Sequence, residues 1–112
     1  MTELRLDPEF ISEHQERCRR IVSGAERPYD VALELMWVIS EHLSSVPAAV
    51  YGIWAELTDV CELQGPAAGA RAQELMRQAA AEFLSLVDYE LELAGYADRW
   101  AERISRDELL KS

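Results

Sequence analysis

Two histidines and two cysteines are the residues of this chain best suited to hold a metal ion. His14 and Cys18 are four positions apart in a segment with helical spacing, so their side chains share one helix face. His42 and Cys61 could complete a Cys₂His₂ tetrahedron from two other helices. The short ligand spacings of zinc modules are absent, however, and all four residues fall on the core or edge positions of apolar stripes. We therefore expect packing residues and no cofactor, and keep a metal or small-molecule site inside the helical bundle as the alternative.

Catalytic motifs are also missing. The tetrapeptide Ile-Ser-Glu-His occurs twice, ending at His14 and at His42, but the flanking residues share no pattern, so it marks no internal repeat. Di-iron bundles need Glu-x-x-His pairs, whereas each glutamate here directly precedes its histidine and points about 100° away from it on a helix. Glycine-rich phosphate loops and G-x-S-x-G are absent. The sequence predicts a protein that is not an enzyme, although a pairing of Cys18 with a histidine in space remains open.

One tryptophan lies off the apolar stripe of its helix. Trp54 and Trp100 fall on stripes expected to face the core, whereas Trp37 and Leu33 point well away from the centre of theirs. An aromatic side chain rimmed by charge is typical of a recognition surface. The candidate partner-binding residues are Asp30, Leu33, Glu34, Trp37, Glu41, Tyr51 and Asp59. Permanent burial of Trp37 by another helix, or by a second copy of the chain in a homodimer, remains an alternative.

The charge distribution narrows the class of partner. The net charge is −10, and residues 29–70 contain six acidic side chains and no lysine or arginine. Such a surface repels nucleic acid and anionic membranes and attracts a basic partner, although a negative charge can also simply keep a domain in solution. Apolar runs of the roughly 18 residues that span a bilayer are absent, and the first residues do not resemble a secretory signal. With only two cysteines, the chain is expected to be cytoplasmic with reduced thiols.

Helical spacing of apolar residues continues along the whole chain. It predicts an all-α fold in a single domain of residues 1–112. The expected helices span residues 8–23, 28–45, 47–63 and 67–110. The last range would be about 65 Å long as one rod, so we expect Asp88 to begin a fifth helix there, with Val87 still on the buried stripe of the fourth.

The second expected helix is apolar on several sides, which predicts a central position in a compact four- or five-helix bundle. Together these features predict a non-catalytic, acidic interaction module, similar in general character to adaptors, regulators and immunity proteins. Its expected partner is a basic or positively rimmed protein.

Overall fold

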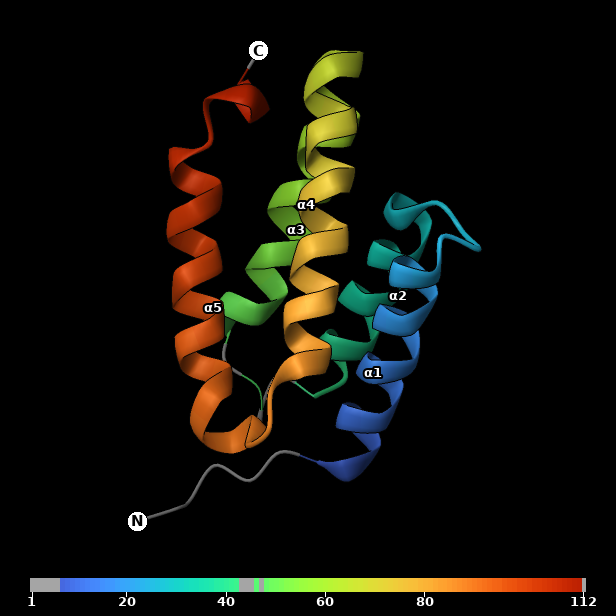
Figure 1. Cartoon of the computed structure of the whole chain (residues 1–112), viewed down its shortest axis with the longest axis vertical. Coiled ribbons are helices and arrows are strands. Elements are labelled where there is room, and N and C mark those ends of the chain that lie inside the picture. The colour runs from blue at the N-terminus through green and yellow to red at the C-terminus, as the bar shows by residue number, and fades with distance from the viewer. Residues whose placement is uncertain (1–6, 43–45, 47, 112) are drawn as a thin grey trace.

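Five α-helices make up most of the chain in the computed structural model, which describes residues 7–42, 46 and 48–111 (Figure 1). They are α1 (Pro8–Ser23), α2 (Pro28–Ser40), α3 (Ala48–Leu63), α4 (Pro66–Ser85) and α5 (Tyr89–Arg106), followed by the short 3₁₀ helix η1 (Glu108–Lys111). The described residues contain no strand. The all-α prediction and the five-helix version of the bundle are confirmed.

The helix boundaries follow from local chemistry. The carboxylate of Asp7 accepts a hydrogen bond from the Glu9 amide at 2.9 Å, and Gly24 ends α1 with a φ of 76°. Leu86 is extended after α4, and the Asp88 carboxylate then accepts the Leu91 amide at 3.2 Å to begin α5. The expected break at Asp88 is therefore confirmed.

Two expectations about helix ends were wrong. The second helix ends at Ser40 rather than near residue 45, because the His42 amide bonds the Ile39 carbonyl three residues back and tightens the last turn. Residues 43–45 and 47 lie outside the described residues. Val87 is 89 % exposed instead of buried, since α4 ends at Ser85 and the backbone turns before Val87 can reach the core.

The helices pack with α3 and α4 in the middle. α3 contacts α2, α4 and α5, while α4 contacts α1, α2 and α3 as well as η1. α2 packs against α1, α3 and α4, as expected of a helix that is apolar on several sides, while the middle of the bundle is formed by α3 and α4. Figure 1 shows α5 at one side of the bundle and α1 and α2 at the other.

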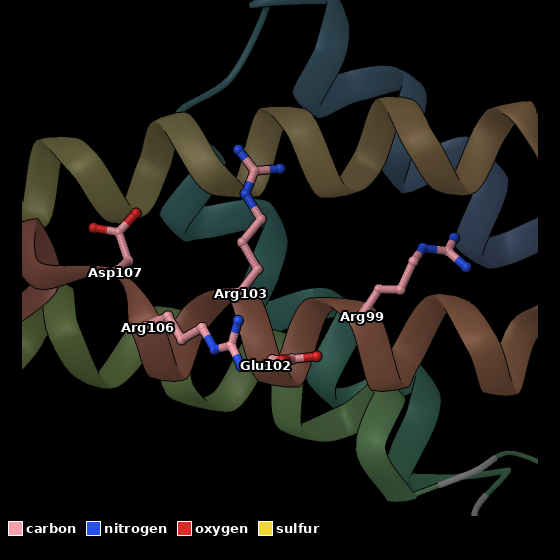
Figure 2. Close-up of a pocket in the computed structure, with 5 residues that line it drawn as sticks. All are labelled: Arg99, Glu102, Arg103, Arg106 and Asp107. Carbon is pink, nitrogen blue, oxygen red and sulfur yellow. Dashed lines mark ion pairs between the residues drawn. The ribbon is translucent and has the colours of Figure 1, made fainter.

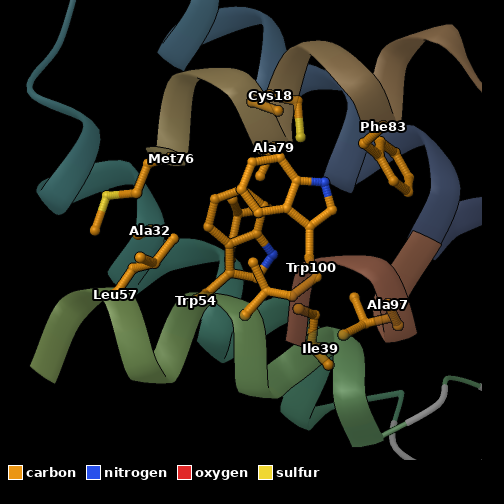
Figure 3. Close-up of a cluster of buried hydrophobic side chains, with 14 of the residues drawn as sticks. Cys18, Ala32, Ile39, Trp54, Leu57, Met76, Ala79, Phe83, Ala97 and Trp100 are labelled. Carbon is orange, nitrogen blue, oxygen red and sulfur yellow. The ribbon is translucent and has the colours of Figure 1, made fainter. Parts of the chain in front are cut away.

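Aromatic side chains dominate the core. Trp54 of α3 and Trp100 of α5 are buried with Phe83, as Figure 3 shows, and this confirms the core positions expected for both tryptophans. The Tyr96 hydroxyl donates a hydrogen bond to the Ala79 carbonyl at 2.9 Å, which ties α5 to α4. Small side chains of α4, among them Ala72, let this helix approach its neighbours closely.

Candidate functional site

The outward face of α2 presents the indole of Trp37 to solvent. The side chains that α2 buries, including Leu35 and Ile39, lie on the opposite face of the helix, and Trp37 is 70 % exposed. Leu33, one turn earlier, is 42 % exposed. We call the outward residues Asp30, Leu33, Glu34, Trp37 and Glu41 the α2 strip. Burial of Trp37 within one subunit, an alternative that the sequence left open, is not what the structure has.

Arginines outside residues 29–70 already neutralise part of the α2 strip. Both carboxylate oxygens of Glu34 accept hydrogen bonds from Arg20, at 2.9 and 2.8 Å, and Arg17 lies 3.6 Å away. These hydrogen bonds lower the pKa of the Glu34 carboxyl group. Asp30 pairs with Arg27 at 3.0 Å. Residues 29–70 contain no lysine or arginine, but basic side chains of α1 and of the turn that follows it neutralise some of the acidic side chains of α2.

Three other acidic side chains on this side of the molecule are exposed and make no ion pair with the described residues. Glu41 of the α2 strip and Asp59 of α3 were expected to contribute to the surface, and both are exposed. Glu56, also exposed, lies three residues before Asp59 and so shares its face of α3. The sequence analysis missed Glu56, although its spacing from Asp59 was a usable signal. These three carboxylates leave unpaired negative charge at the end of α2 and along α3.

Tyr51 lies on the flank of α3 that faces α2. It is half-buried against the core and seven residues before Thr58, whose hydroxyl oxygen lies 3.5 Å from the sulfur of Met36. At the other end of the pair, the Tyr29 hydroxyl donates to the Glu62 carboxylate at 2.6 Å, so α2 and α3 run antiparallel. The flank of α3 that carries Tyr51 therefore lies toward the end of α2, while Asp59 is exposed on α3.

His14 and Cys18 are buried together between α1, α3 and α4. The His14 Nδ1 atom lies 3.4 Å from the Cys18 sulfur, and the imidazole centroid is 4.0 Å from the Phe83 ring. Burial first, and the positive charge of Arg17 second, lower the pKa of His14 to about 3. Burial also raises the pKa of the Cys18 thiol. Both groups are neutral near pH 7, so the contact supplies no thiolate for nucleophilic chemistry.

The two remaining candidate metal ligands are not assembled with that pair. The His42 ring lies 5.6 Å from Phe10, and its Nδ1 atom is 3.5 Å from an oxygen of Asp7. The Cys61 thiol instead donates to the Gly69 carbonyl at 3.7 Å, where α3 meets α4. Within the part of the chain that the structure describes, no three histidine, cysteine or carboxylate side chains are grouped as metal ligands.

Comparisons of the chain with protein-family models, curated proteins and solved structures find no match. Among the described helices, none combines the length and the apolar character that crossing a membrane requires.

Proposed function

We propose that this chain is a non-catalytic helical interaction module that binds a basic or positively rimmed protein through the α2 strip and the adjoining face of α3. The observation that carries the proposal is the exposed indole of Trp37 beside exposed Leu33. Both lie on a regular helix, so their positions are set before a partner arrives. Rigid aromatic anchors of this kind contribute a large part of the binding energy of many interfaces.

The exposed carboxylates near Trp37 indicate that the partner's surface is positively charged. Glu41, Glu56 and Asp59 carry negative charge that no described basic residue neutralises. Lysine or arginine side chains around an apolar pocket would pair with these carboxylates while the pocket receives the indole. Because the acidic side chains are exposed, their contribution is mainly to the association rate and should fall as salt rises.

The proposed setting is the cytoplasm. Cys18 and Cys61 are both free thiols, which is typical of proteins in reducing compartments. Their separate positions, in the core and at the junction of α3 and α4, support packing roles for both.

Co-purification from the native host tests the proposal. Wild type, Trp37→Ala and Leu91→Ala would be used as bait at low and at high salt. Leu91 is an exposed apolar residue of α5, outside the proposed surface, so its variant is a matched control for loss of apolar surface. A true partner should be retained by wild type and by the control and lost from Trp37→Ala. With the purified partner, loss of a central tryptophan should weaken Kd by about 30-fold or more.

Three outcomes would contradict the proposal. If every retained protein binds Trp37→Ala as well as it binds wild type, Trp37 is not the anchor. If binding of a partner depends on Trp37 but does not fall as salt rises, and the partner has no basic surface, the proposed role of the acidic side chains is wrong. Sedimentation showing a wild-type dimer that Trp37→Ala converts to a monomer assigns the surface to a second copy of the chain instead.

A further inference from the structure

A second surface, on α5, combines three arginines with a hollow of about 480 Å³. Its lining residues are Arg99, Glu102, Arg103, Arg106 and Asp107, drawn in Figure 2. The arginines follow one another at intervals of four and three residues, so they share one face of the helix. α5 itself lies at the side of the bundle away from α2 (Figure 1), and the proposed partner surface does not include it.

Arg103 is the arginine of this group without a carboxylate partner among the described residues. Its guanidinium group extends toward α4 (Figure 2), where it donates to the Gln78 side-chain oxygen, and its central carbon lies 4.5 Å from the centre of the Trp100 ring. Stacking on a buried indole holds the group in place without neutralising its charge. Arg103 therefore presents a fixed positive charge beside the hollow.

The two flanking arginines have partners of different strength. Arg99 donates to Glu82 at 2.6 Å, and that glutamate also accepts the Trp100 indole N–H. Arg106 pairs with Glu102 at 2.6 Å, but both side chains are exposed, so the pair contributes little and can be exchanged for another anion.

The acidic lining residues leave the arginines in excess. Asp107 is already held by Arg71 from α4 at 2.9 Å. Glu102 is balanced by Arg106, and the carboxylate that pairs with Arg99 does not line the hollow. The positive charge of Arg103 thus remains uncompensated, in a protein whose net charge is −10.

We propose that this hollow binds a small ligand through a carboxylate or phosphate group, with Arg103 as the principal contact and Arg99 and Arg106 at its flanks. Guanidinium groups match the geometry of both oxyanions and form strong, charge-assisted hydrogen bonds with them. The volume is within the range of small-molecule sites. The negative charge of the whole protein opposes the approach of an anion, so short-range contacts with Arg103 supply the affinity.

The indole N–H of Trp100 is a built-in reporter, because Arg103 covers the ring and Glu82 accepts the proton. Titration of ¹⁵N-labelled protein with inorganic phosphate and with citrate distinguishes a phosphate ligand from a carboxylate ligand. Sodium chloride at equal ionic strength is the control, because it measures the effect of screening alone. A saturable shift at Trp100 and at the α5 amides with either oxyanion supports the proposal. Equal shifts with chloride would overturn it.

Matched variants test which arginine binds. Arg103→Gln should weaken oxyanion binding by about tenfold, the effect of losing one charge-assisted hydrogen bond. Arg77→Gln makes the same change in net charge at an exposed arginine of α4 and should leave binding nearly unchanged. Equal weakening by the two variants would overturn the proposal, because it would indicate attraction by overall charge.

A gain of affinity provides a test that does not depend on the folding of Arg103→Gln. Glu102→Gln removes the carboxylate that competes for Arg106, so oxyanion binding should strengthen several-fold. Asp30→Asn, which releases Arg27 at the start of α2 with the same change in net charge, is its control. If Glu102→Gln binds the oxyanion no more tightly than Asp30→Asn does, the proposal is overturned. The Trp37 experiments concern another face, so either proposal can fail without the other.

Discussion

Trp37 on α2 and Trp100 on α5 place the same side chain in opposite surroundings. The Trp100 ring is buried, its N–H donates to Glu82 at 2.6 Å, and Arg103 covers one face. Trp37 is largely exposed, and the nearby Glu34 is already bound by arginines of its own chain. An indole that is fully provided with contacts stabilises a fold, whereas one left in solvent contributes little to it.

The difference arises from helix phase rather than from residue type. Trp100 is four residues after Tyr96 and four before Ile104, on the face of α5 that packs against the core. Trp37 lies between buried Leu35 and Ile39 in the sequence, but on the opposite side of α2 from them. The comparison indicates that Trp37 is available for a partner and that Trp100 is part of the framework of the fold.

The largest effect should come from removing each indole in turn. Trp100→Ala leaves a cavity in the core and should lower the free energy of unfolding by about 3–5 kcal/mol. Trp37→Ala should change it by less than about 0.5 kcal/mol, because most of that ring remains in water. Urea unfolding followed by circular dichroism measures both. A loss of several kcal/mol for Trp37→Ala would mean that this residue is structural, and the comparison would fail.

Acid titration extends the comparison to the buried imidazole. His14 has a pKa of about 3 when folded and a value near the ordinary 6.5 when unfolded. Between these values the unfolded chain binds a proton that the folded chain does not, so stability is complete above pH 6.5 and falls as the pH decreases toward 3. Lowering the pH from 7 to 4.5 should cost about 2–3 kcal/mol through His14 alone.

The measurement compares wild type with His14→Phe, in which no group titrates at that position, by urea unfolding across this pH range. Carboxylates contribute to acid unfolding in both proteins, so the difference between the two curves isolates His14. An imidazole resonance of His14 that titrates near pH 6.5 in the folded protein would contradict the expected burial of its neutral form.

Glu82, which accepts the hydrogen bond from the Trp100 N–H, provides a further test of the comparison between the two tryptophans. Glu82→Ala removes the oxygen that satisfies the buried N–H of Trp100 and should destabilise the fold by about 1–2 kcal/mol. Glu74→Ala, eight residues earlier on α4 and exposed, is the control and should have little effect. Thermal unfolding of the two variants decides the point. Equal stabilities would show that the Trp100 N–H does not depend on Glu82.

Periodicity was sufficient to predict the elements and the core tryptophans, because burial within a helix repeats every three or four residues. Helix ends were harder to predict. Val87 continues the spacing of α4, but the chain leaves the helix at Ser85, and nothing in the apolar pattern marks that position. Only the capping carboxylate of Asp88, three residues after the last residue of α4, was a local signal.

The candidate site was predicted in part for a related reason. The exposure of Trp37 follows from its angle on one helix, which the sequence contains. The neutralisation of Glu34 depends on Arg17 and Arg20 from another helix, and the separation of Cys61 from His14 depends on how three helices pack. Pairings between helices are set by tertiary geometry, so a count of acids and bases along residues 29–70 overstated the free negative charge of α2.

The smallest effect on stability is expected at the start of α5, the helix that places Trp100 beside α4. Asp88→Ala removes the side-chain oxygen that accepts the Leu91 amide at 3.2 Å and should cost about 1 kcal/mol. Asp59→Ala removes an exposed aspartate in the interior of α3 and should cost less than about 0.5 kcal/mol. Amide hydrogen exchange provides a second measure, since loss of the cap should increase fraying in the first turn of α5 while leaving the amides around Trp37 unchanged. Unaltered exchange in that turn would show that packing against α3, rather than the Asp88 cap, determines where α5 begins.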